Sequence, residues 1–264
     1  MTGVDPEALA RARGLVEGSD RILVLTGAGV SAESGVPTFR GEEGLWKRYR
    51  PEELANPLAF RRDPRLVWEW YAWRRETVRG CDPNPGHRAL ARLALEREGV
   101  TLVTQNVDDL HARAAREEAG DRAPEPAHPL ELHGSLFRVR CTGCFERREH
   151  SGPIDASAVE TLPRCSSCGS LLRPDVVWFG ESLDPRVIEA ARHRAETADL
   201  CLVVGTSAVV QPAASLPRTT AAAGGDVLEV NPDETPLTSL AAAALRGPAG
   251  RVLPRLLDDS SGRA

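Results

Sequence analysis

The chain has 264 residues and a formal net charge of -5, with a pI near 5.8. This length suits one sizeable α/β core with a small satellite domain, and the acidic balance argues against a nucleic-acid-binding surface, which needs a basic face. No signal-peptide pattern opens the chain, and the longest apolar stretches, at 22–25 and 200–204, are too short to span a bilayer. We therefore expect a cytoplasmic protein that binds neither nucleic acid nor membrane, with a monomer as the default.

Short apolar runs alternate with longer segments of helical character along most of the chain. The predicted strands cover residues 21–26, 101–104, 130–133, 176–179, 200–204 and 227–230. The predicted helices cover residues 8–17, 65–79, 85–97, 110–119, 185–196 and 213–223, with a helical turn at 30–34 and helical packing for the Ala-rich stretches at 221–223 and 241–244. Because the strands are continuous apolar runs, this order predicts an α/β fold, a Rossmann-like doubly wound parallel sheet with helices on both faces.

Four of the six cysteines form two pairs in a segment that interrupts this pattern. Cys141 and Cys144 enclose two residues, and twenty residues later Cys165 and Cys168 do the same. Each pair can direct two thiolates at one ion, and four thiolates complete a tetrahedron that leaves no position for water. We therefore expect one structural Zn²⁺ in an inserted zinc-ribbon and helical unit; a disulfide framework is the alternative, disfavoured in a reducing cytoplasm. The predicted lobes of this single domain are a large one, about 1–40, 81–136 and 174–264, and a small one, about 41–80 and 137–173.

Three short loops that follow predicted strands predict a nucleotide site. They are Gly27, Ala28 and Gly29; Gly205, Thr206 and Ser207; and Asn231, Pro232 and Asp233. The first fits Gly-x-Gly-x-x-Ala, in which glycine lets the backbone approach a pyrophosphate. Each loop alone is most simply a helix N-cap, but parallel strands end at one edge, so together the loops favour a dinucleotide. An ordinary dehydrogenase has a second strand that ends in an acidic residue about twenty positions after the glycine-rich loop. This chain has no such strand, which argues against that class of enzyme.

Several long motifs, in this order around the cysteines, resemble those of the sirtuins, the NAD-consuming protein-lysine deacylases. They are the stretch from Gly27 to Gly41, Thr-Gln-Asn-Val-Asp at 104–108, Leu-His-Gly-Ser at 132–135, Val-Trp-Phe-Gly-Glu at 177–181 and Gly-Thr-Ser at 205–207. The resemblance covers essentially the whole chain. It implies NAD as co-substrate, a structural zinc ion, and acylated-lysine proteins or peptides as substrates.

Within the family, the chain resembles the class III branch, whose members prefer acidic acyl groups. The marker is a Tyr-x-x-Arg pair, Tyr71 and Arg74, which share one face of a predicted helix. A guanidinium matches a carboxylate with two parallel hydrogen bonds, and a phenol adds another, which suits a succinyl, malonyl or glutaryl group. Ala55 matches a small residue that widens the acyl pocket in this branch. Without the resemblance, Tyr71 and Arg74 would be an aromatic core residue beside a surface arginine.

The resemblance also implies residue roles. His133 matches the general base, which deprotonates a ribose hydroxyl after nicotinamide has left, and Asn106 and Asp108 match residues that hold the nicotinamide ribose and carboxamide. The further residues matched to cofactor binding are Gly27, Ala28, Gly29, Glu33, Phe39, Arg40, Trp46, Gln105, Val107, Gly205, Thr206, Ser207, Asn231, Pro232, Asp233 and Ala249. Those matched to substrate binding, besides the acyl pocket, are Val177, Phe179 and Gly180, on an edge to which an extended peptide can add.

Two departures from the family pattern stand out. The segment between Asp108 and His133 is longer than in most members of the family, and its composition is typical of a surface loop. Ala249 stands where this branch commonly has cysteine. The resemblance implies that this residue contacts adenine through its backbone, so a change of side chain should preserve the contact. The alternatives to an acidic-acyl deacylase are a deacetylase without that preference, a protein ADP-ribosyltransferase, and a zinc-ribbon module that senses NAD without catalysis.

Overall fold

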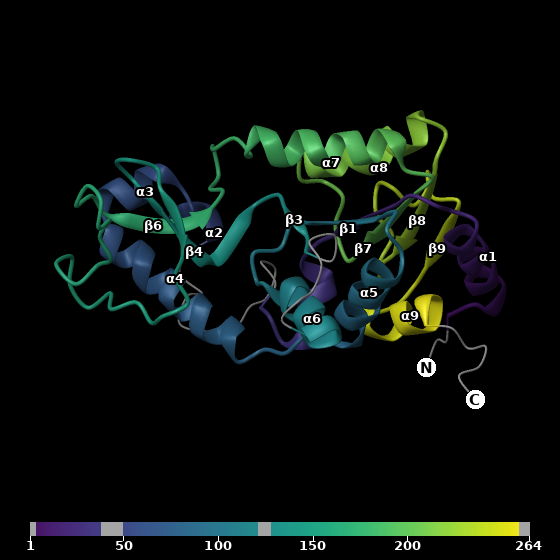
Figure 1. The fold of residues 1–264 in the computed structure, drawn as a ribbon, viewed down its shortest axis with the longest axis horizontal. Helices are drawn as coiled ribbons and strands as arrows, with labels where there is room; N and C mark the ends of the chain where they lie inside the picture. The colour runs from purple at the N-terminus through teal and green to yellow at the C-terminus, as the bar shows by residue number, and fades with distance from the viewer. Residues whose placement is uncertain (1–3, 38–49, 121–127, 259–264) are drawn as a thin grey trace.

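A computed structural model of the protein describes residues 4–37, 50–120 and 128–258 (Figure 1). This part of the chain contains one six-stranded sheet and one three-stranded sheet, which lie at opposite ends of an elongated molecule. No helix in the described ranges is long and apolar enough to cross a membrane.

The six-stranded sheet is entirely parallel. Its strands are β1 (Ile22–Thr26), β2 (Val100–Thr104), β3 (Leu130–Glu131), β7 (Leu200–Val204), β8 (Asp226–Val230) and β9 (Ala243–Leu245). They run in the order β3-β2-β1-β7-β8-β9. The strand order reverses between β1 and β7, and open α/β sheets bind ligands beyond the carboxyl ends of the strands at such a point.

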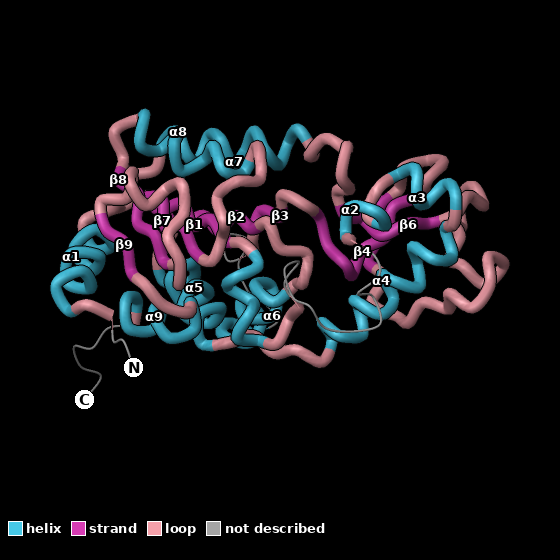
Figure 2. Tube along the Cα trace, turned by 180° about the vertical axis from the view of Figure 1, so that it is seen from behind, coloured by secondary structure: helices cyan, strands magenta, loops and turns pink. Residues whose placement is uncertain are grey.

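Helices cover both faces of this sheet (Figure 2). One face carries α1 (Pro6–Glu17), α5 (Pro85–Glu96), α6 (Leu110–Ala119) and α9 (Ala249–Leu257), and the other carries α7 (Pro185–Thr197) and α8 (Leu216–Ala222). In β1, Ile22 and Val24 belong to the first hydrophobic core, whereas Leu23 and Leu25 belong to the second. The continuous apolar run is therefore buried from two sides, and the predicted doubly wound fold is confirmed.

The three-stranded antiparallel sheet has the order β5-β4-β6, from β4 (Gly134–Cys141), β5 (Arg147–Glu149) and β6 (Leu172–Val176). It shares a hydrophobic core with α2 (Pro51–Leu54), α3 (Pro57–Arg62) and α4 (Pro64–Arg79). Asp63 caps α4 by accepting a hydrogen bond from the backbone N–H of Leu66. The buried face of α4 shares a core with Leu136 and Val139 of β4. The boundaries between the two lobes stay a prediction.

Two sequence-based assignments of secondary structure are wrong. Residues 177–179 do not continue the strand that ends at Val176, because the N–H groups of Val177 and Phe179 donate to carbonyls on two different segments. The Ala-rich stretch at 241–244 does not form a helix, since it enters β9, where pairing with β8 overrides the helix propensity of alanine. The sequence analysis also missed α9, which contains Pro254.

Candidate active site

Glycines let the loops after β1 and β7 approach each other closely. The backbone N–H of Gly29 donates to the carbonyl of Gly205 at 2.8 Å. A Cβ on Gly29 would lie 2.7 Å from that carbonyl oxygen, and one on Gly205 would lie 2.4 Å from the nitrogen of Val30. Gly205 also has a φ of 57°, in the left-handed region. The predicted glycine-rich loop therefore starts η1 (Ala28–Ser34) directly at the switch point of the sheet.

The other predicted cofactor loops meet at the same edge of the sheet. The backbone N–H of Gln105, after β2, donates to the carbonyl of Thr26 at 3.0 Å, and its side-chain amide donates to Thr206 Oγ1 at 2.9 Å. Asn231, after β8, donates to the carbonyl of Thr206 at 2.8 Å. Pro232 and Asp233 are exposed beside Asn231. The three loops that the sequence analysis assigned to one crevice thus meet at this edge, together with Gln105, which was matched to NAD binding by resemblance.

Ser31 is the centre of a buried polar network. Its hydroxyl donates to Asp108 Oδ2 at 2.7 Å, and it accepts a hydrogen bond from Asn106 Nδ2 at 3.1 Å. His87 Nε2 lies 3.2 Å from the same oxygen, while Nδ1 of that ring accepts from the backbone N–H of Asn84. The ring of His87 therefore donates to Ser31. Burial raises the pKa of Asp108 and lowers that of His87 well below its usual value.

The sequence analysis did not single out Ser31 or His87. Ser31 lies inside the long glycine-rich motif, so its position offered a signal. His87 lies in the first turn of α5 after the Asn84 cap, and nothing in the local sequence distinguishes it from a structural histidine.

His133 is held in the orientation that a proton acceptor needs. Its Nδ1 lies 2.9 Å from the carbonyl oxygen of Gln105, so Nδ1 carries the hydrogen and Nε2 keeps its lone pair. Burial lowers the pKa of His133, and the hydrogen bond to Gln105 opposes that effect. A lowered pKa keeps the ring neutral, and therefore basic at Nε2, at neutral pH.

Tyr71 and Arg74 lie one turn apart on α4, as predicted from their spacing. Tyr71 is fully buried, and its hydroxyl accepts a hydrogen bond from Trp178 Nε1 at 2.9 Å. The guanidinium carbon of Arg74 lies 4.8 Å from the ring centroid of Trp70 and 5.5 Å from that of Tyr71. Burial lowers the pKa of Arg74, against the opposing effects of Tyr71 and of the Asp108 carboxylate.

The segment at 177–181, which follows β6, contacts both His133 and the end of α2. The backbone N–H of Val177 donates to the carbonyl of His133, and that of Phe179 donates to the carbonyl of Ala55, both at 2.9 Å. Phe179 is 53% exposed, and Gly180 has a positive φ of 84°. Val177 therefore lies beside His133, and Phe179 lies beside Ala55.

The four predicted zinc ligands come together at one end of the small sheet. Their Sγ atoms lie within 4.8 Å of one another, with 3.4 Å between Cys141 and Cys168 and 3.6 Å between Cys144 and Cys165. Zn–S bonds of about 2.3 Å in a tetrahedron require S···S distances of about 3.8 Å, so the residues fit this ion. All six cysteines of the chain are free thiols, which excludes the disulfide alternative in this structure. The cluster can hold a zinc ion without an open coordination position.

Comparisons with known proteins agree with this site. The profile of the Sir2 family matches residues 27–212. The chain belongs to the Sir2 family. It is 56% identical over 241 residues to NAD-dependent protein deacylase 1 of Archaeoglobus fulgidus, covering 90% of the chain and 92% of that protein. It is 45% identical over 260 residues to the mitochondrial NAD-dependent protein deacylase sirtuin-5 of Danio rerio, covering 90% and 82%. The crystal structure of a Sir2 homolog–NAD complex superposes with a TM-score of 0.82 at 52% identity, covering 97% and 93%.

This sirtuin is therefore an NAD-dependent protein deacylase with a four-cysteine metal site. Two residues matched to the cofactor lie close together where η1 meets α9: the carboxylate of Glu33, in η1, accepts from the backbone N–H of Gly250 at 2.6 Å, next to the buried Ala249. Val107 lies between Asn106 and Asp108, and its carbonyl accepts from Leu136. The other matched residues Phe39, Arg40 and Trp46 lie outside the described residues, so their roles stay predictions.

Proposed function

We propose that this sirtuin removes succinyl, malonyl and glutaryl groups from protein lysines, and acetyl groups more weakly, releasing nicotinamide and O-acyl-ADP-ribose. The observation that carries this proposal is the placement of Arg74 and Tyr71 on one face of α4, with the Arg74 guanidinium beside the Tyr71 ring. A terminal carboxylate is the acyl feature that a guanidinium and a phenol both recognise. The small side chain of Ala55, which is buried nearby, supports a pocket that accepts a longer acyl chain.

In this proposal His133 accepts the proton of the ribose hydroxyl at its Nε2 atom. Asn106 and Asp108, which are linked through Ser31, hold the nicotinamide half of NAD, and the loops at Gly27, Gly205 and Asn231 hold the rest. NAD, when bound, supplies the anomeric carbon that receives the acyl oxygen.

The segment around Val177, Phe179 and Gly180 binds the peptide, since Val177 contacts the backbone of His133 and Phe179, two residues later, offers an exposed apolar ring. We also propose that the enzyme acts as a cytoplasmic monomer. The four cysteines gathered in a metal-binding cluster support a reducing compartment, where disulfides are rare.

The test compares matched succinyl-lysine and acetyl-lysine peptides with NAD, with products followed by mass spectrometry. The wild type is expected to remove succinyl faster than acetyl. Arg74→Met should abolish desuccinylation while sparing deacetylation. Only the succinyl group has a carboxylate, so only succinyl binding depends on a contact with the guanidinium. Arg79→Met is the matched control, since it removes an exposed arginine from the same helix.

Three other outcomes would each contradict part of the proposed function. Equal loss of both activities in Arg74→Met contradicts a carboxylate contact. A wild type that prefers acetyl keeps the deacylase class and rejects the acidic preference. Cleavage of NAD without removal of either acyl group points to ADP-ribosyl transfer.

A further inference from the structure

The hydrogen bond between Trp178 and Tyr71 determines which way the tyrosine hydroxyl can donate. Trp178 is 2% exposed and Tyr71 is 0% exposed, and 2.9 Å separates the indole nitrogen from the hydroxyl oxygen. An indole N–H can only donate, so the oxygen of Tyr71 must accept. The guanidinium of Arg74, beside the same ring, is also only a donor. The hydrogen of the Tyr71 hydroxyl therefore cannot be given to either neighbour.

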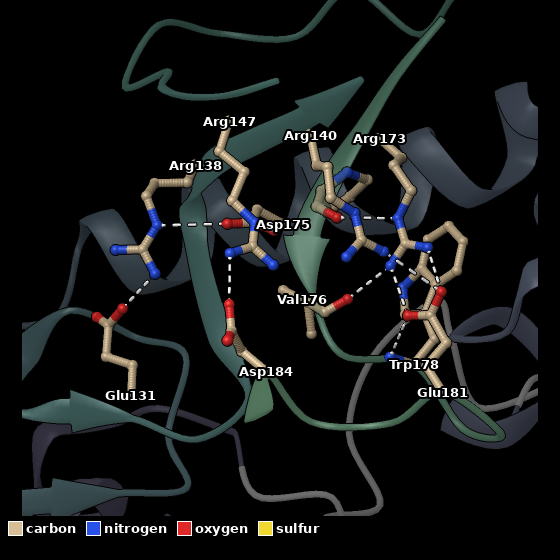
Figure 3. A network of polar contacts seen from close by, with 11 residues as sticks. Glu131, Arg138, Arg140, Arg147, Arg173, Asp175, Val176, Trp178, Glu181 and Asp184 are labelled. Carbon is tan, nitrogen blue, oxygen red and sulfur yellow. Dashed lines mark hydrogen bonds and ion pairs between the residues drawn. The ribbon is translucent and has the colours of Figure 1, made fainter. Parts of the chain in front are cut away.

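The indole is fixed in place, because it stacks on a charged network that also holds the backbone of Trp178 (Figure 3). The guanidinium of Arg173 stacks on the ring of Trp178, with 3.4 Å between its central carbon and the ring centroid. Arg173 also binds both carboxylate oxygens of Glu181, at 2.6 and 2.8 Å. Glu181 in turn accepts from the backbone N–H of Trp178 at 2.9 Å. Phe60 packs against the indole at a centroid distance of 5.4 Å. The direction of the Nε1–H bond is therefore set by the surrounding structure.

We propose that Trp178 is a specificity-determining positioning residue, which orients the hydroxyl hydrogen of Tyr71 toward the acyl group without touching that group itself. This inference rests on the proposed acidic-acyl function. Within residues 4–37, 50–120 and 128–258, the structure contains no hydrogen bond in which Tyr71 is the donor. A terminal carboxylate offers the acceptor that this hydroxyl needs, whereas the methyl group of an acetyl does not. Donation from the indole also polarises the phenol and makes it a stronger donor.

Kinetics on four proteins test the proposal: the wild type, Trp178→Phe, Tyr71→Phe and the double variant, each with succinyl-lysine and acetyl-lysine peptides. Trp178→Phe is expected to lower the succinyl-to-acetyl ratio of kcat/KM by about five- to tenfold, the effect of one buried neutral hydrogen bond. In the Tyr71→Phe background the same change should leave the ratio unaltered, because the hydroxyl that the indole orients is gone. Multiplicative effects of the two changes would overturn the proposal.

A packing control separates orientation from general damage to the core. Phe60→Leu disturbs the packing against the indole ring and leaves its N–H intact, so it should lower both activities together and keep their ratio. If Trp178→Phe also lowers both activities equally, Trp178 is only structural.

The hydrogen bond to Tyr71 can also be tested by NMR spectroscopy, without measuring enzyme activity, because the chain has two tyrosines, Tyr49 and Tyr71. Protein labelled with 3-fluorotyrosine should give two ¹⁹F resonances, and Tyr49→Phe assigns the one from Tyr71. Trp178→Phe is expected to shift that resonance in the free enzyme, and the absence of a shift would refute the orienting hydrogen bond. A wild type that does not prefer succinyl contradicts the proposed function, whereas this spectrum still tests the contact.

Discussion

Acid should destabilise this protein through His111, a buried histidine beneath the active site. His111 is 3% exposed, and its Nε2 lies 2.9 Å from Thr26 Oγ1. Because Thr26 donates its hydroxyl hydrogen to Thr104, it accepts from Nε2–H of His111. The buried Nδ1 atom has no hydrogen-bond partner among the described residues. Protonation would place a charged N–H at Nδ1 with nothing to accept it, and burial lowers the pKa of His111 from 6.5 to about 4.

The size of the effect follows from these two pKa values. Between pH 6.5 and pH 4 the unfolded chain binds a proton at His111 that the folded protein does not, so the folded state loses stability as the pH falls. At pH 7 this contribution is close to zero. At pH 5 the linkage between pKa values of 6.5 and about 4 corresponds to a loss of about 2 kcal/mol, and the loss approaches about 3 kcal/mol near pH 4.

Urea unfolding of the zinc-loaded wild type and of His111→Gln at pH 7 and pH 5 measures this loss. The glutamine amide can still donate to Thr26, but it does not titrate. The wild type should lose about 2 kcal/mol more unfolding free energy than the variant between the two pH values. Titrating groups distant from His111 are present in both proteins and cancel in the difference, whereas His87, whose ring centroid lies 4.8 Å from that of His111, is coupled to it and contributes to the measured effect. Equal losses in the two proteins would show that His111 is not the buried neutral ring described above.

Three further changes test other parts of the structure. His133→Ala should lower kcat by at least about 100-fold and leave the calorimetric Kd for NAD nearly unchanged, and a variant that keeps turnover would exclude His133 as the base. Because burial lowers the pKa of His133 below its usual 6.5, the acid limb of the wild-type pH–rate profile should lie below that pH. Cys144→Ser should release the zinc ion, measured by elemental analysis, and unfold the small sheet; a variant that retains one zinc ion per chain contradicts the four-thiolate site. Glu229 is 1% exposed and accepts from Arg246 at 2.8 Å beneath the Asn231 loop, so Glu229→Gln should raise the KM for NAD and leave kcat within about twofold. A fall in kcat at unchanged KM would refute that positioning role.

The sequence by itself was sufficient where the determining interactions are local. The continuous apolar runs at 22–25 and 200–204 are buried on both faces in the structure, because a parallel strand needs cover on both sides. The helix predicted at 110–119 has those limits in the structure. The Cys-x2-Cys spacing brings two thiolates together within each pair, so the metal cluster could be inferred before its geometry was available.

Only the tertiary structure decided the features that depend on partners distant in the chain. The stretch at 241–244 becomes a strand because β8 lies beside it, and local helix propensity carries no information about that neighbour. His87 joins the active-site network through Ser31, 56 residues earlier in the chain. Trp178 meets Tyr71 across 107 residues. A hydrogen bond has a direction and a length of about 3 Å, and a sequence pattern supplies residue types and spacings but no distances between separate segments. The orientation of the proposed specificity residues therefore followed from the fold alone.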